Sequence, residues 1–532
     1  MHIVIADQLP ASAVGLLTSL AGCTVDAKAG RAPADLARDL ANADALVVRS
    51  ATTVDEALIA AAPKLRVIAR AGTGVDNVDV PAATTRGIVV MNAPGANSVS
   101  VAEHALALML SLARAVPAAD ATMKRGVWDK KKLTGIELRS KTLGLVGLGR
   151  IGQEVAARAR AFGMEIVAHD PFISEQVAGT LGVELLDLDG LCARADYISL
   201  HIPATPETRH LFNSDRLAKC RKNARLINTA RGELIDEAAL AKAITSGHIA
   251  GAGLDVFETE PPRDSALTAL PQVVATPHIA ASTVEAQEQV GLETAAAVRD
   301  FLVDGVIRNA VNFPAVPSED FEKVRPFMVL ADRMGALVSQ LAGGRTHSIG
   351  IRHYGPLVSA NAGLLASSVV AGVLRPMLSS TVTVVNARTV AESRGIEIVE
   401  SKSSRPRDFA NLLSIKLHTS EGERWIEGTV FEPGSPRLAM LDGVDVEAPL
   451  EGVVLVLHND DRPGVIGGVG TILGRHGINI ASFALGRSAT GAVGVVALDA
   501  DADAPALLAA VQEIRALPAV KDARTATITP RR

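Results

Sequence analysis

The chain has 532 residues, 48% of them hydrophobic and 21% charged, with a formal net charge of −5. This length predicts about three or four domains, and the composition is typical of a globular protein. The weak negative charge excludes a general nucleic-acid partner. Without an uncharged apolar run of about 18 residues, we expect no membrane span. Three separated cysteines and the absence of a signal-peptide pattern predict a cytoplasmic protein without disulfides or a zinc site.

Short apolar segments alternate with alanine-rich helical segments at the start of the chain. We expect strands at residues 2–6, 45–49, 65–69 and 88–91, with helices such as 35–41 and 55–61 between them. This alternation predicts a parallel sheet covered by helices on both faces. Ligands bind such sheets at the carboxyl ends of the strands.

A second α/β pattern follows an apolar helix expected at residues 97–114. It extends over residues 141–279 and is followed by a helix at 282–303. Prolines mark a linker at 309–320. Beyond it, strands are expected at 381–387 and 412–419, and residues 452–529 have the β-α-β-β-α-β order of a ferredoxin-like fold.

A glycine motif begins the second α/β pattern. Gly147, Gly149 and Gly152 follow an apolar strand and begin a helix. The first glycine permits a tight turn, the second lets a pyrophosphate approach the backbone, and the third lets the helix pack on the sheet. Arg150 adds a cation beside the helix N-terminus, which attracts phosphate. Asp170 ends the next strand, where a carboxylate binds ribose hydroxyls and repels a 2′-phosphate, so the motif predicts NAD rather than NADP.

Three side chains downstream of the motif have the chemistry that oxidation of a hydroxy acid requires. His278 is the candidate base for the hydroxyl proton, and Glu260 is the candidate carboxylate that orients it. Arg231 can bind a substrate carboxylate with its planar fork. Each also has a structural interpretation: a solvated histidine, a polar loop, or an arginine that pairs with Glu237.

Five segments make the sequence similar to the D-2-hydroxyacid dehydrogenase family. They are RAGTGVDNVDV, GLGRIGQEVA, NTARGELIDEAAL, AGLDVFETEP and TPHIAAST. The resemblance is strongest to the phosphoglycerate-oxidising members that have a long C-terminal extension, and it spans nearly the whole chain. It implies that His278 is the acid–base group, Glu260 its partner and Arg231 the carboxylate anchor, with 3-phosphoglycerate as substrate.

The same resemblance implies a set of NAD-contacting residues in addition to the glycines. They are Thr73, Arg150, Ile151, Asp170, Thr205, Thr229, Ala230, Arg231, Asp255, His278, Ile279, Ala280 and Ala281. It also implies a fold with four parts, listed in chain order. They are a flavodoxin-like substrate domain (1–95 and 285–310), a Rossmann-like NAD domain (96–284), an α+β intervening domain (315–450) and a ferredoxin-like ACT domain (452–529).

Two arginines in the first domain bear on the choice of substrate. Arg49 and Arg70 end predicted strands, so both are expected to face the cleft and could bind a phosphate. The alternative is that they are solvated or pair with Asp76 or Asp79. Without a phosphate site, the runner-up enzyme is a glyoxylate or hydroxypyruvate reductase. A binding protein, an NAD-sensing corepressor, is the alternative from another class.

The C-terminal segments resemble regulatory domains. In the ACT-like segment, Asn459, Asp461 and Asn479 are the residues that the resemblance implies for L-serine binding, where two copies of the domain meet. The alternative is a dimerisation module without a ligand, and the family analogy implies a homotetramer. Five basic residues of the preceding segment form either a second anion site or a solvated basic face: Arg388, Arg394, Lys402, Arg405 and Arg407.

Overall fold

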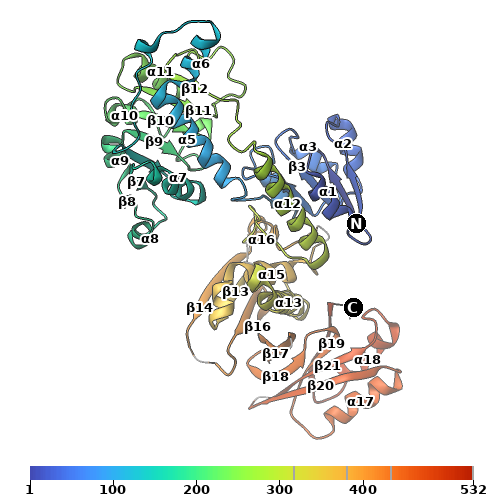
Figure 1. Cartoon of the computed structure of the whole chain (residues 1–532). Coiled ribbons are helices and arrows are strands. Elements are labelled where there is room, and N and C mark those ends of the chain that lie inside the picture. Colours follow the sequence, from blue (N-terminus) through green and yellow to red (C-terminus); the bar gives the residue numbers. More distant parts are fainter. Residues whose placement is uncertain (315–317, 379–380, 406, 432–433, 490, 530–532) are drawn as a thin grey trace.

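The computed structural model describes residues 1–314, 318–378, 381–405, 407–431, 434–489 and 491–529. Four β-sheets, formed in chain order, organise the molecule. Figure 1 shows them as successive lobes, with the glycine-motif sheet and the N-terminal sheet at one end and the C-terminal sheet at the other. Helix α12 (Val284–Asp304) leaves the second lobe and returns to pack on the first (Figure 1).

The N-terminal sheet is entirely parallel and has the order β2-β1-β3-β4-β5. Its strands are β1 (His2–Ile5), β2 (Thr24–Ala27), β3 (Ala45–Val48), β4 (Val67–Arg70) and β5 (Val89–Met91). Its helices are α1 (Ala11–Thr18), α2 (Pro33–Leu40), α3 (Glu56–Ala60) and α4 (Val80–Thr85). Buried Leu17 of α1 belongs to the same apolar cluster as Ala295 and Val298 of α12. The returning helix therefore completes this lobe.

The second sheet is parallel and has the order β12-β11-β10-β9-β6-β7-β8. Its strands are β6 (Thr142–Val146), β7 (Glu165–His169), β8 (Glu184–Leu185), β9 (Tyr197–Leu200), β10 (Arg225–Asn228), β11 (Gly251–Leu254) and β12 (Val273–Ala275). The strand order reverses direction at β6 and β9, which places a ligand crevice at their carboxyl ends.

Helices cover both faces of this second sheet. They are α5 (Ser98–Arg114), α6 (Val116–Lys124), α7 (Arg150–Ala161), α8 (Glu175–Thr180), α9 (Leu188–Arg194), α10 (Ser214–Lys219) and α11 (Glu237–Thr245), with 3-10 turns η1 (Lys130–Lys132) and η2 (Gly232–Leu234). Side chains cap several of them; Asp236, for example, accepts from the Ala239 N–H at the start of α11. In the described part of the chain no single helix is long and apolar enough to cross a membrane. Helices α5 and α6 together have the length and composition of a span, but they are bent by 65° relative to each other.

The third sheet is mixed, with β13 and β14 parallel and the other pairs antiparallel. Its strands are β13 (Thr346–Tyr354), β14 (Glu397–Ser403), β15 (Leu412–Thr419), β16 (Gly422–Phe431), β17 (Ser435–Leu441) and β18 (Val444–Pro449). Its helices are α13 (Ser318–Leu341), α14 (Pro356–Ala360), α15 (Ala362–Leu374) and α16 (Ala387–Ser393). A Cβ at Gly372 would lie 2.1 Å from the Asp332 carbonyl oxygen, so glycine permits the close contact of α15 with α13.

The fourth sheet is antiparallel and has the order β20-β21-β19-β22. Its elements are β19 (Gly452–Asn459), α17 (Val465–Arg475), β20 (Asn479–Ser488), β21 (Gly491–Asp499), α18 (Pro505–Arg515) and β22 (Val520–Thr529). This order confirms the predicted ferredoxin-like arrangement. The buried apolar side chains of α17 and α18 share one core with those of the strands.

The predicted strand at 381–387 is wrong. Residues 381–386 form no strand, and α16 begins at Ala387. The Thr383 hydroxyl donates to the Gly87 carbonyl and Asn386 donates to the Thr85 carbonyl, so this segment docks against the N-terminal lobe. Its alternating β-branched residues suggested a strand. Val382 and Val385 are indeed buried, but they lie in an irregular segment that ends in a turn.

The predicted linker is partly structured. Ala310 forms an antiparallel bridge with Met91, and the Val311 N–H donates to the Val90 carbonyl, so the chain follows β5 before it enters the third lobe. Residues 315–317 of the linker lie outside the described residues. Strands β2 and β8 were not predicted from the sequence.

Candidate active site

The glycine motif forms the turn between β6 and α7. Gly147 has φ +97°, and a Cβ there would lie 2.6 Å from the His201 carbonyl oxygen. A Cβ at Gly152 would lie 2.3 Å from the Gly147 carbonyl oxygen, which explains the tight packing of the helix start. Gly149 is exposed, and a Cβ there would meet no atom within 4 Å, so this side of the turn is open to a ligand.

Asp170 lies directly after β7, beside this turn. Its Oδ2 accepts from the Leu148 N–H at 2.8 Å and its Oδ1 accepts from the Phe172 N–H at 2.9 Å. The two backbone bonds fix the carboxylate, and each oxygen keeps a lone pair for a further donor. The geometry fits the hydroxyl groups of a ribose.

Other predicted cofactor residues surround the same crevice. Thr229 follows β10, and its hydroxyl is buried without a hydrogen-bond partner among the described residues. Such an unsatisfied buried group fits a ligand that would complete its bonding. The Arg150 guanidinium donates to the Pro94 carbonyl at the crossing between the two lobes. Thr205 stabilises its own loop through Thr208, with 3.2 Å between the two hydroxyl oxygens, and Thr73 donates to Asn97 at 3.0 Å.

His278 and Glu260 form a close pair. Nδ1 of His278 lies 2.7 Å from Oε2 of Glu260, and because an ionised carboxylate only accepts, Nδ1–H donates. The other oxygen of Glu260 accepts from the Phe257 N–H at 3.1 Å, which fixes the carboxylate. The His278 side chain is 54% exposed, so Nε2 is left to face the crevice as an acceptor. This arrangement can take a proton from a substrate hydroxyl.

Arg231 lies at the adjacent strand end. Residues 231, 260 and 278 follow β10, β11 and β12, which are neighbours in the sheet. A Cβ at Gly232 would lie 1.9 Å from the Phe257 carbonyl carbon, so glycine lets the Arg231 segment contact the Glu260 loop. Nη2 of Arg231 donates to Oδ2 of Asp76 at 2.9 Å, whereas the alternative partner Glu237 accepts from the Glu258 N–H.

Arg70 ends β4 and Arg49 directly follows β3, where Nη1 of Arg49 donates to the Gln8 carbonyl at 3.4 Å. Burial lowers the pKa of Arg70 below its usual value, and the positive charges of Arg231 and Arg49 lower it further, while Asp76 opposes them. Nε of Arg70 is buried without a partner among the described residues. Asp7 supports the Arg49 loop by accepting from the Arg49 N–H at 2.5 Å. The Arg231 guanidinium of the second lobe is therefore near that of Arg70, which is also near Arg49 in the first lobe, and an anion between them would relieve their repulsion.

Asp255, a predicted cofactor neighbour, is 0% exposed and lies behind the turn that contains His278. Its Oδ1 accepts from the Ile279 N–H at 2.9 Å and its Oδ2 accepts from the Ala280 N–H at 2.8 Å. Burial alone would raise the pKa of Asp255, but the hydrogen bonds from His104, Thr276 and these amides lower it below its usual range. The carboxylate therefore holds the backbone of the turn that contains His278 by accepting hydrogen bonds from it. Ala280 is likewise buried, with 4% of its surface exposed.

Several supporting residues were missed in the sequence. Asn228, 0% exposed, donates to the Arg231 carbonyl at 2.8 Å and accepts from the Ala230 N–H at 3.0 Å. His104 of α5 lies 2.9 Å from the Thr276 hydroxyl. A polar residue at the end of an apolar strand, such as Asn228 in β10, is a sequence signal that could have identified this site. His104 gave no signal, because it occurs within an apolar helix far from residue 276 in the sequence.

The three predicted effector residues do not meet within one chain. Asn459 pairs with Ala492 at one end of β21, whereas Asn479 pairs with Asp499 at the other end. Ala492 and Asp499 are seven residue steps apart along β21, about 23 Å at 3.3 Å per step. Asp461 lies 3.3 Å from Nε of Arg487, near the Asn459 end. One amino acid could contact all three only where a second copy supplies one of the two ends.

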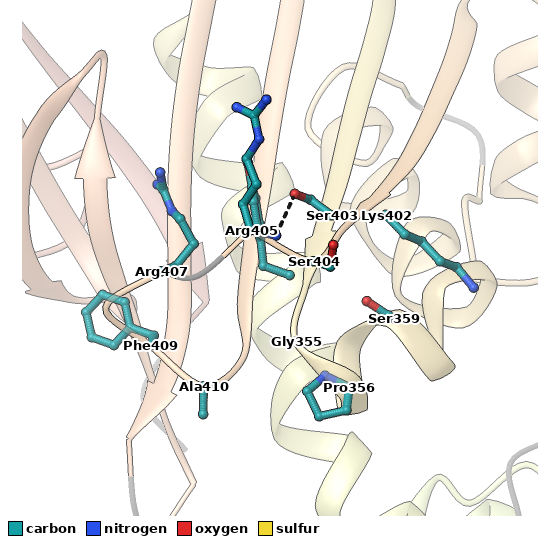
Figure 2. A pocket seen from close by; sticks show the side chains of 11 residues that line it. Gly355, Pro356, Ser359, Lys402, Ser403, Ser404, Arg405, Arg407, Phe409 and Ala410 are labelled. Atoms are coloured by element: carbon teal, nitrogen blue, oxygen red, sulfur yellow. Dashed lines mark hydrogen bonds between the residues drawn. The ribbon is translucent and has the colours of Figure 1, made fainter.

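The five basic residues of the third lobe do not all line one site. A cavity of about 670 Å³ is lined by Lys402, Arg405 and Arg407 among others. Figure 2 draws these side chains. In this view Arg405 and Arg407 extend in one direction and Lys402 points away from them (Figure 2). Arg407 forms an ion pair with buried Glu427, and Arg388 pairs with Glu400. The structure therefore favours the interpretation of a basic face over a single anion site.

Comparisons with known proteins match three segments of the chain to family models. Residues 106–280 match the D-isomer specific 2-hydroxyacid dehydrogenase NAD binding domain. Residues 323–442 match the D-3-phosphoglycerate dehydrogenase intervening domain, and residues 453–519 match the ACT domain.

Similar proteins cover nearly the full length. D-3-phosphoglycerate dehydrogenase of Methanocaldococcus jannaschii is 42% identical over 523 residues, which are 98% of this chain and 99% of that protein. The protein of the same name from Mycobacterium tuberculosis is 42% identical and covers 94% of this chain and 95% of its own length. Among solved structures, the TT0316 protein from Thermus thermophilus is 38% identical with a TM-score of 0.54, covering 58% of this chain and all of that one.

Proposed function

The chain belongs to the D-3-phosphoglycerate dehydrogenase family of D-isomer specific 2-hydroxyacid dehydrogenases, and on that premise we propose that it oxidises 3-phospho-D-glycerate to 3-phosphohydroxypyruvate. This is the first step of the phosphorylated route to L-serine. The observation that carries the proposal is the His278–Glu260 pair beside the Arg231, Arg70 and Arg49 guanidinium groups. The histidine–glutamate pair can take a proton, and the guanidinium groups can bind two anionic groups.

The proton is removed by His278. Because Nδ1–H donates to Glu260, the lone pair of Nε2 is available to the C2 hydroxyl of the substrate. Glu260 stabilises the imidazolium that forms. The nicotinamide cofactor, when bound, supplies the acceptor for the C2 hydride. Loss of the hydroxyl proton from oxygen to Nε2 of His278, and of the hydride from C2 to that acceptor, would convert the C2 alcohol to a ketone.

The substrate's two anionic ends define the roles of the arginines. Arg231 binds the carboxylate, exchanging its bond to Asp76 for a bidentate one. Arg70 and Arg49 bind the phosphate, because both end strands of the opposite lobe and Nε of Arg70 lacks a partner among the described residues. The family membership gives a nicotinamide cofactor, and we propose NAD rather than NADP because Asp170 would repel a 2′-phosphate.

The C-terminal ACT domain is the proposed regulatory site. L-serine would bind between two copies, contacting Asn459 and Asp461 of one and Asn479 of the other, since one chain holds these residues at opposite ends of β21. A homotetramer would provide such pairs. A cytoplasmic location is proposed because the three cysteines are free thiols. Serine titration of the initial rate tests the site, and Asn479→Ala should abolish any inhibition without lowering the rate itself.

The test of the substrate is a comparison of Arg49→Ala and Arg70→Ala on 3-phosphoglycerate and on unphosphorylated D-glycerate, with NAD. Each variant should lower kcat/KM for the phosphorylated substrate about 10- to 100-fold, since hydrogen bonds to charged groups contribute about 1.5–3 kcal/mol. The activity on D-glycerate should change less than threefold. Equal losses on both substrates would reject the phosphate site and favour a glyoxylate or hydroxypyruvate reductase. Tight NAD binding without turnover would favour a corepressor.

A further inference from the structure

A chain of hydrogen bonds connects helix α5 to the turn that contains His278. Nε2 of His104 lies 2.9 Å from the Thr276 hydroxyl, and that hydroxyl donates to Oδ1 of Asp255 at 2.5 Å. A hydroxyl has one proton, which Thr276 gives to the carboxylate. Thr276 must therefore accept from His104, so Nε2 of His104 bears the hydrogen. This fixes both the tautomer and the direction of the chain.

Asp255 connects this chain of hydrogen bonds to the turn that contains His278. Its carboxylate, 0% exposed, accepts from the N–H groups of Ile279 and Ala280, the two residues after His278. Its backbone carbonyl accepts from the His278 N–H at 2.8 Å. Asp255 thus holds the turn before and after the histidine.

The turn needs such support because His278 has φ +53°. This left-handed conformation is unfavourable for any residue with a Cβ and persists only where the surroundings impose it. In it, the His278 ring meets Glu260 at 2.7 Å. If the backbone relaxed to the ordinary region, the ring would point elsewhere and the proton acceptor would leave its place.

Helix α5 holds this loop at a second point. The Ser100 hydroxyl lies 2.7 Å from the Thr283 hydroxyl, and Thr283 caps α12 by accepting from the Ala286 N–H. Ser100 and His104 are one helical turn apart and therefore lie on one face of α5. The face contacts both ends of loop 276–283.

We propose that His104 is a positioning residue for the reaction: through Thr276, and through the 3.4 Å contact of its own Nε2 with Oδ1 of Asp255, it maintains the left-handed turn that directs His278 to Glu260. This inference rests on the proposed acid–base role of His278. His104 itself does not touch the substrate. Its side chain is 18% exposed and belongs to the helix behind the sheet edge, not to the crevice.

Two substitutions at His104 distinguish the effect of its hydrogen bond from the effect of its side-chain volume. His104→Leu removes the donor, and His104→Gln keeps an N–H near the position of Nε2. We expect His104→Leu to lower kcat about 10- to 100-fold, the effect of losing a hydrogen bond in a charged network. KM for 3-phosphoglycerate and the NAD dissociation constant, measured by fluorescence quenching, should stay within threefold. His104→Gln should recover kcat to within threefold of the wild type.

Matched variants guard against a general loss of folding. His248→Leu removes another partly buried histidine of the same lobe, whose Nε2 lies 3.1 Å from the Leu217 carbonyl oxygen, and it should leave kcat within twofold. Thr276→Val removes the middle hydroxyl with little change in volume and should lower kcat as His104→Leu does.

The inference is overturned if His104→Leu keeps kcat within threefold of the wild type, or if His104→Gln loses as much as the leucine variant. Thermal melts distinguish a loss of stability from a loss of positioning. His248→Leu and His104→Leu should lower Tm by similar amounts, but only His104→Leu should lower kcat. Failure of the proposed function looks different: His278→Ala would then retain its kcat.

Discussion

Arg231 donates through Nη2 to Oδ2 of Asp76 at 2.9 Å, an ion pair that joins the end of β10 to the loop after β4. The pair spans the crevice between the two catalytic lobes. Asp76 is 72% exposed and Arg231 is 28% exposed, so the bond is weak and can be exchanged for a substrate carboxylate.

Asp76→Asn should therefore strengthen substrate binding. Removing the carboxylate frees Arg231 and removes a negative charge that repels a doubly anionic substrate. Since an exposed pair contributes about 1 kcal/mol at most, we expect KM for 3-phosphoglycerate to fall about two- to fivefold with kcat little changed. Steady-state kinetics at low salt measure this, with Asp120→Asn as control, an exposed ion-paired aspartate on α6. A raised KM would mean that Asp76 orients Arg231 rather than competing for it.

Glu260→Gln tests the role of the partner carboxylate. The amide oxygen can still accept from Nδ1 of His278, but the negative charge that stabilises an imidazolium is lost. We expect kcat to fall about 10- to 100-fold, with the NAD dissociation constant unchanged. The exposed Glu258, which accepts from the Glu237 N–H at 3.2 Å in the same loop, provides the control substitution Glu258→Gln. If Glu260→Gln and Glu258→Gln change kcat by the same factor, the charge of Glu260 does not stabilise the imidazolium.

Asp170→Asn tests the choice of cofactor. The asparagine oxygen keeps one of the two backbone hydrogen bonds, so the turn is retained while the charge is removed. NAD should bind about tenfold more weakly, because a charge-assisted bond to a ribose hydroxyl is lost. NADP should bind more tightly, because its 2′-phosphate is no longer repelled. Fluorescence titration with both cofactors measures the ratio; an unchanged ratio would remove Asp170 from the specificity site.

Much of the fold was predictable because its signals are local. The apolar strands followed by glycine, aspartate or arginine gave the two parallel sheets and the carboxyl-end positions of Gly147, Asp170 and Arg231. Short strands such as β8, with only Glu184 and Leu185, have no periodicity to detect. The segment at 381–387 looked like a strand because β-branched residues alternate in it, but contacts with the N-terminal lobe determine its backbone conformation.

The site was predictable only where each residue follows a strand. Sequence reasoning identified Arg231, Glu260 and His278 as candidates, and the structure brings them to three adjacent strand ends. The sequence could not show that Asp255 is buried, because its burial depends on how the following turn folds over it. Nor could the sequence show that Asn459 and Asn479 lie far apart, since their distance depends on the sheet order and not on the nineteen residues between them.

His353 predicts how acid destabilises the third lobe. It is 0% exposed, and burial lowers its pKa to about 4, with Glu400 opposing and Lys402 and Arg388 adding to the shift. The unfolded chain has a histidine pKa of about 6.5, so between these values only the unfolded state is protonated. Acidification therefore favours unfolding, by about 1.4 kcal/mol at pH 5.5. His353→Leu should show a smaller drop in Tm between pH 7.5 and 5.5; an equal drop would contradict the assignment.

The most direct test of the account is the turnover of His278→Ala with 3-phosphoglycerate and NAD, measured together with its NAD dissociation constant. General base catalysis contributes about 10²- to 10⁴-fold, so kcat should fall by that factor. The NAD dissociation constant should remain within threefold of the wild type, because the glycine turn and Asp170 are untouched. A variant that retains kcat within threefold of the wild type would contradict the central claim that His278 accepts the substrate proton.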